Sequence, residues 1–139
     1  MEYYEERYIT DINKMPQKCR ELIEEFKKMG YITSPEYGVE EKECVIILFP
    51  PYQDAEVSMV HYYPEEDKVD FSVKKIVKAE HKIVEIPLSF LKEFSDIIDA
   101  LELSVSIDKE YGKVSLRVSK GKIDKEKALK IIEAFFKSL

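Results

Sequence analysis

The sequence has few of the residues that mark nucleotide-binding, metal-binding or secreted proteins. It contains no tryptophan, four glycines and two cysteines, and its only side-chain amides are Asn13, Gln17 and Gln53. The four glycines form neither of the two common phosphate-binding patterns, which argues against P-loop and Rossmann-type nucleotide binding. A scarcity of amides together with many lysines and glutamates is typical of proteins from thermophiles.

Long hydrophobic runs are also lacking. The longest uninterrupted apolar run covers residues 45–51, whereas a membrane-spanning helix needs about 20 such residues. The N-terminal residues 1–11 are acidic and aromatic, so they do not have the basic start and apolar stretch of a signal peptide. We therefore expect a cytoplasmic protein without a membrane span.

The two cysteines, Cys19 and Cys44, fall in different predicted elements and form no CxxC pair. We expect two buried, reduced thiols, because disulfide frameworks are typical of smaller and more cysteine-rich chains. Neither His61 nor His81 lies at a metal-ligand spacing from another histidine or cysteine. The sequence thus predicts no metal site and no cofactor. An enzyme whose site is assembled by the fold, from residues such as Cys44, His61 and His81, stays open as an alternative.

The composition is that of a folded protein. The chain has 139 residues, of which 45% are hydrophobic and 36% are charged, enough to bury a core as one domain covering residues 1–139. Residues 1–12 are a candidate mobile arm. The net charge of −6 disfavours attraction of the whole molecule to nucleic acid.

Hydrophobic periodicity predicts the secondary structure. Apolar residues spaced three and four apart indicate helices at 14–29, 88–101 and 125–138. Alternating or β-branched segments indicate strands at 44–49, 55–63, 69–74, 82–86, 103–107 and 114–118. Residues 31–42 are expected to form a loop. Short connections favour an antiparallel sheet, so the order α-β-β-β-(β)-α-β-β-α predicts an α+β fold with helices on one face of the sheet.

A sheet that is covered on one face leaves the other face open. On the last two strands that face is predicted to be lined by small polar residues and one arginine: Ser104, Ser106, Ser115, Arg117 and Ser119. In the final helix, the adjacent Phe135 and Phe136 diverge by about 100°, so either the helix lies deep between layers or these rings meet a partner. We take all seven residues as candidate partner-binding residues and expect a homodimer.

Basic residues offer an alternative surface. Lys74, Lys75, Lys78, Lys82 and Arg117 would form a positive stripe for nucleic acid if their strands are neighbours. Glu80, Asp124 and Glu126 dilute this charge. We therefore favour a solvated strand face, on which lysines discourage edge-to-edge pairing of sheets.

The predicted element order carries one resemblance. In the segment 86–94 a strand runs into a helix through Pro87, and a hairpin and a last helix follow. This arrangement resembles the type III secretion chaperone-like fold, which the YbjN family shares. Members of that fold bind polypeptides or serve as small adaptors, commonly as dimers, and are not enzymes. The resemblance therefore implies a non-enzymatic protein- or peptide-binding adaptor, and it implies no particular functional residues.

Overall fold

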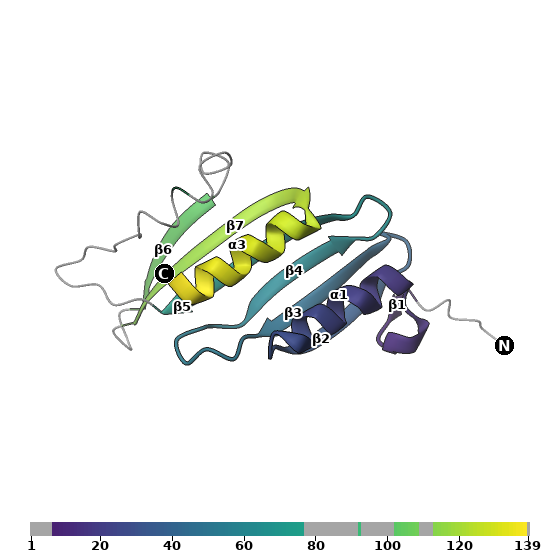
Figure 1. Cartoon of the computed structure of the whole chain (residues 1–139), viewed down its shortest axis with the longest axis horizontal. Helices are drawn as coiled ribbons and strands as arrows, with labels where there is room; N and C mark the ends of the chain where they lie inside the picture. The colour runs from purple at the N-terminus through teal and green to yellow at the C-terminus, as the bar shows by residue number, and fades with distance from the viewer. Residues whose placement is uncertain (1–6, 77–91, 93–101, 109–112, 139) are drawn as a thin grey trace.

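The computed structural model describes residues 7–76, 92, 102–108 and 113–138. The strands in these ranges form one antiparallel sheet in the order β1-β2-β3-β4-β5-β7-β6 (Figure 1). They are β1 (Tyr8–Ile9), β2 (Ile32–Gly38), β3 (Glu43–Phe49), β4 (Ser58–Tyr63), β5 (Lys68–Ile76), β6 (Glu102–Asp108) and β7 (Lys113–Asp124). The predicted antiparallel sheet and α+β class are confirmed.

Two helices cover the same face of the sheet. A short 3-10 helix, η1 (Ile12–Lys14), leads into α1 (Gln17–Lys28), and α3 (Lys125–Ser138) ends the described chain. In Figure 1, α1 lies over the β2–β3 side of the sheet and α3 over the β5–β7 side. This confirms the one-sided arrangement that the amphipathic pattern predicts.

The core lies between the helices and the sheet. Helix α1 contributes Cys19, Leu22, Ile23 and Phe26, whose three- and four-residue spacing forms a single buried stripe. On β5 every second residue is buried from Val69 through Phe71 and Val73 to Lys75, as the alternation of a half-buried strand requires. Gly30, with a φ of 90°, follows the end of α1 and adopts the left-handed conformation that favours glycine there.

Three local predictions need correction. Residues 32–38, expected to be a loop, form β2 and pair with β3 along its whole length. Residues 8 and 9, expected to belong to a mobile arm, pair with Gly38 and Tyr37. The strand expected at 114–118 is longer: β7 continues through Gly121 to Asp124. The predicted strand 82–86 and helix 88–101 lie outside the described residues, apart from Lys92, which is helical.

Candidate partner-binding face

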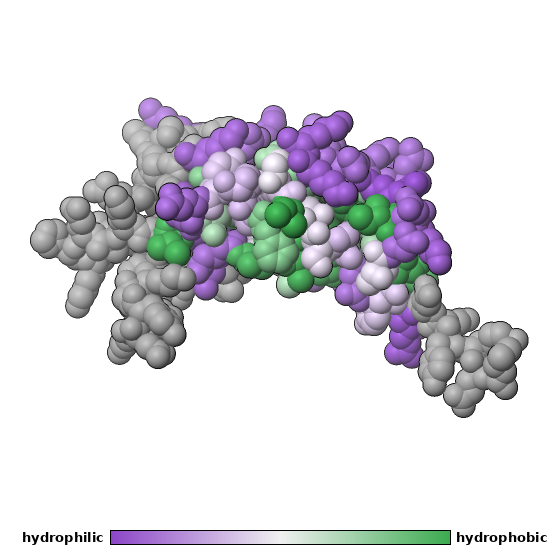
Figure 2. Space-filling model, turned by 90° about the horizontal axis from the view of Figure 1, so that it is seen from below, coloured by the Kyte–Doolittle hydropathy of each residue, from purple (hydrophilic) through white to green (hydrophobic). Residues whose placement is uncertain are grey.

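The sheet face opposite the helices, which we call the outer face, carries an apolar strip. Exposed apolar side chains on β2–β4 and the residues before β4 are Ile32 (71% exposed), Phe49 (42%), Val57 (58%) and Met59 (39%). The half-buried Val45 and Ile47 belong to the same strip. Figure 2 looks at the molecule from the β2 edge of the sheet, and apolar atoms gather in the middle of this view, with hydrophilic atoms mainly above them and to the sides.

The strand register makes this strip continuous. Ile32 pairs with Phe49, and Ile47 pairs with Met59. The pairing of Leu48 with Ser58, extended by one residue, brings Val57 opposite Phe49. Isolated apolar residues are normal on a protein surface, but contiguous patches mark interaction sites.

Polar residues cluster at the end of the outer face where β3 begins and β4 ends. The Nδ1 of His61 lies 3.6 Å from the Oε2 of Glu43, and its Nε2 lies 3.2 Å from the Sδ of Met59. Burial, together with the hydrogen bond that the Tyr63 hydroxyl donates to Glu43, raises the pKa of Tyr63 to about 12. The Nζ of Lys122 lies 4.3 Å from the centroid of the Tyr63 ring, at cation–π distance.

The predicted serine and arginine positions come together in register. Ser104 pairs with Arg117 and Ser106 with Ser115 across β6 and β7. Arg117 and Ser119 in turn pair with Lys74 and Ser72 of β5. The backbone therefore brings these predicted positions next to β5, while the apolar strip lies on β2–β4.

The two predicted aromatic residues of α3 belong to the core. Phe135 is 0% and Phe136 is 4% exposed. The ring of Phe136 stacks on Tyr52 at a centroid distance of 5.8 Å and meets Tyr31 edge-on at 6.2 Å. Aromatic side chains from two other segments therefore cover Phe136. Since Phe135 and Phe136 are both buried, neither ring is available to a partner.

The basic stripe predicted for nucleic acid does not assemble as expected. Lys75 is 2% exposed, and its Nζ donates to the carbonyl oxygens of Phe135 and Phe136, so it cannot reach a phosphate. The Nζ of Lys74 lies 3.6 Å from the Oε2 of Glu56. Lys78 and Lys82 lie outside the described residues.

The expectation of two reduced thiols is wrong. Cys19 of α1 and Cys44 of β3 form a disulfide, with their Cα atoms 6.3 Å apart, and both residues are fully buried. Cys44 points into the core, whereas His61 lies on the outer face. These two residues therefore do not form a nucleophile–base pair, and His81 lies outside the described residues. Among the described residues, no three His, Cys, Asp or Glu side chains form a group that would hold a metal ion.

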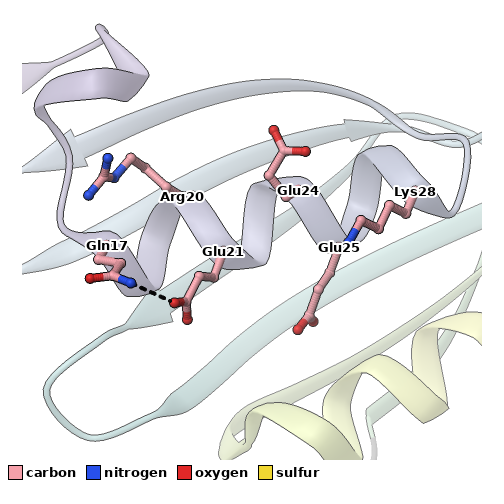
Figure 3. Close-up of a pocket in the computed structure, with 6 residues that line it drawn as sticks. All are labelled: Gln17, Arg20, Glu21, Glu24, Glu25 and Lys28. Carbon is pink, nitrogen blue, oxygen red and sulfur yellow. Dashed lines mark hydrogen bonds between the residues drawn. The ribbon is translucent and has the colours of Figure 1, made fainter.

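The helical side of the molecule has a shallow groove along α1, with a volume of about 440 Å³. Gln17 donates a hydrogen bond of 3.1 Å to Glu21 at one end of it. Arg20 and Glu24 extend to one side of the helix, while Glu21 and Glu25 extend to the other (Figure 3). Because these side chains diverge, they do not form a convergent site of the kind that catalysis requires.

Comparisons of this chain with known families, proteins and structures find no match. The chain matches no family model, and no curated protein or solved structure has significant similarity to it. Within the described residues, no helix is both long enough and apolar enough to cross a membrane.

Proposed function

We propose that this protein is a non-catalytic binding module, and that it binds a polypeptide on the outer face of its sheet. The observation that carries this proposal is the apolar strip formed by Ile32, Phe49, Val57 and Met59, together with the half-buried Val45 and Ile47. The two described helices, α1 and α3, both lie on the other face of the sheet (Figure 1). A partner that covers the strip would remove this apolar surface from water, which is favourable by about 25 cal/mol per Å².

The mixed character of the outer face also fits a protein partner. Interfaces are apolar and aromatic at their centre and polar at their rim. Here the strip is bordered by Glu43, His61 and Tyr63 at one end and by Lys74 beside β4. This arrangement supports binding of a folded surface or an extended peptide better than binding of a small molecule, which favours a deep concave pocket.

Photo-cross-linking tests the proposal. We would place p-benzoylphenylalanine at position 59, and at position 24 as the control, because Glu24 is exposed on α1 on the other side of the sheet. Polypeptide adducts are expected from position 59 only, and the additional substitution Phe49→Asp should abolish them. Equal adducts from both positions, or none from position 59, would contradict the proposal.

A further inference from the structure

The apolar strip of the outer face meets carboxylates at one of its ends. In the middle of the strip, Ile47 of β3 pairs with Met59 of β4. Two residues toward the start of β3, Val45 pairs with Glu36 of β2. Two residues along a strand span about 7 Å. A carboxylate of β2 therefore lies one step beyond the centre of the strip.

This end of the outer face contains a hollow of about 370 Å³. Its described lining consists of three glutamates, an aromatic residue, a glycine and a residue of the strip: Glu36, Glu41, Glu43, Tyr8, Gly38 and Val45. A Cβ atom at Gly38 would lie 2.5 Å from the Oε2 of Glu41, so the carboxylate of Glu41 folds over this glycine. None of the described lining residues is basic.

Most of this negative charge is not balanced within the described part of the chain. None of the ion pairs found there involves Glu36 or Glu41. Glu43 lies 3.6 Å from the Nδ1 of His61, a side chain that is positive only when it is protonated. Asp70 of β5 pairs with His61 and adds a further carboxylate at the same level of the face.

The lysines at this end are already paired. The Nζ of Lys42, in the turn before β3, lies 3.4 Å from Glu65. The Nζ of Lys68, which pairs with Tyr63 across the strands, lies 2.7 Å from Asp124. Each pair is neutral as a whole, so these lysines do not offset the glutamates of the hollow. A cationic group from a partner is attracted to this end, and the net charge of −6 acts in the same direction.

From this arrangement, and resting on the proposed function, we infer that the polypeptide bound on the outer face is an amphipathic helix with basic residues at one end. Its apolar side covers the strip, and its lysine or arginine side chains enter the hollow between Glu36, Glu41 and Glu43. Burial of apolar surface supplies the affinity. Charge complementarity fixes which way round the segment lies and which segments are accepted.

A helix suits this face better than an extended segment does. A helix pairs its backbone groups with one another, whereas an extended segment that lies across a sheet face finds no backbone partners there. The same strands already bind a helix in this way on their other face. The buried stripe of α1 lies over the β2–β3 side of the sheet (Figure 1).

The length of the face sets the spacing in the partner. The pair Ile32–Phe49 lies four residues along the strands from the pair Glu36–Val45, which is about 14 Å. A helix covers this length with about nine residues. The partner should therefore have apolar residues at positions i, i+3, i+4 and i+7, and lysine or arginine about one turn beyond one end of this stripe.

Peptide display tests the inference first. A phage library of peptides about 16 residues long, or about four helical turns, is selected on the wild-type protein, with Met59→Asp as the matched bait. We expect the wild type alone to enrich peptides with the apolar stripe and a basic end. Basic peptides that bind any acidic protein would be enriched by both baits. Enrichment by both baits alike, enrichment of acidic or uncharged ends, or no enrichment would overturn the inference.

Charge reversal on both sides tests the contact with the hollow. In one selected peptide the basic residues are replaced by glutamate, and in the protein Glu36→Lys is combined with Glu41→Lys. Each change alone is expected to weaken binding at least about tenfold in fluorescence anisotropy, because like charges then meet. The two changes together should restore binding.

The matched control combines Glu24→Lys with Glu126→Lys. Both glutamates are exposed on the helices of the other face, and the net charge changes by the same amount. This control should weaken binding by less than about threefold, since it acts only through the charge of the whole molecule. Equal effects of the two glutamate pairs, or no recovery in the doubly reversed complex, would show that the basic end does not enter the hollow.

The two proposals fail separately. Polypeptide adducts from position 59 that persist unchanged when Glu36→Lys and Glu41→Lys are introduced would reject the basic helix and keep the proposed function. The absence of both adducts and selected peptides would reject both proposals.

Discussion

The ammonium group of Lys75, on β5, donates a hydrogen bond of 3.4 Å to the carbonyl oxygen of Phe135, near the end of α3. The same group bonds the carbonyl of Phe136 and lies 3.7 Å from Asp54. The last carbonyls of a helix lack partners within the helix and carry partial negative charge. A buried lysine of the sheet therefore satisfies the C-terminal end of the helix that packs on it.

We expect Lys75→Met to lower the free energy of unfolding by about 3 kcal/mol, because it leaves buried helix carbonyls without their donor. The matched control is Lys74→Met, on the neighbouring residue that faces the outer side and pairs with Glu56. Its cost should stay below about 1 kcal/mol, as for exposed ion pairs. Urea unfolding followed by circular dichroism measures both, and equal losses would rule out the capping role of Lys75.

Reduction of the Cys19–Cys44 disulfide should destabilise the protein by about 3 kcal/mol, because the bond closes a loop with a sequence separation of 25 residues. We expect a reductant to lower the urea midpoint of the wild type. It should not change the midpoint of the variant carrying Cys19→Ala and Cys44→Ala. Thiol titration in denaturant gives the redox state of each sample. An unchanged midpoint in a fully reduced wild type would contradict the prediction.

Stability should fall at alkaline pH. Burial raises the pKa of Tyr31, Tyr62 and Tyr63 above that of unfolded tyrosine, to about 12 for Tyr63. A pKa that is higher in the folded state gives stability that is complete below about pH 10 and is lost as the pH rises toward 12. Lys68, whose pKa the hydrogen bond with Asp124 raises, acts with the same sign.

Urea midpoints measured from pH 8 to pH 11.5 check this prediction. The double variant Tyr62→Phe and Tyr63→Phe should lose less stability over this range than the wild type. A wild-type midpoint that stays constant up to pH 11.5 would show that the phenol groups titrate normally in the folded protein.

Substitutions at two phenylalanines distinguish a core position from a position on the proposed binding surface. Phe135→Ala should cost about 3–5 kcal/mol, because it leaves a cavity in a fully buried cluster. Phe49→Ser, at a 42% exposed position, should cost less than about 1 kcal/mol while reducing the polypeptide adducts formed from position 59. Thermal melts and photo-cross-linking of the two variants separate these effects. The assignment fails if Phe49→Ser is the more destabilising change.

Several elements could be predicted because their patterns are strong. The apolar stripe of α1 and the alternation of Val69, Phe71 and Val73 in β5 indicate both the element and its buried face. β2 was missed because residues 32–38 contain Pro35, end in Gly38 and show no apolar alternation. β2 is stabilised by its backbone pairing with β3, and an alternating pattern in its own sequence is not needed.

The disulfide and the apolar strip of the outer face could not be predicted, for different reasons. The helical stripe of α1 and the alternation of β3 each direct a cysteine inward, but only the packing of α1 on the sheet brings Cys19 to Cys44. The continuous apolar run of β3 indicates a strand that is buried on both faces. In the structure, Phe49 is exposed and Val45 and Ile47 are half-buried. The apolar run alone does not show that one face of β3 stays partly exposed among the described residues.

The order of the strands has a consequence for the folding kinetics. β2, β3, β4 and β5 pair with their neighbours in sequence, so these hairpins form by closing short loops. β7 instead pairs with β5 across a separation of 56 residues between Lys68 and Asp124. Distant pairings cost more loop entropy and slow folding. We therefore expect amide protection to appear first in β2–β5, with the docking of β7 on β5 as the rate-limiting event.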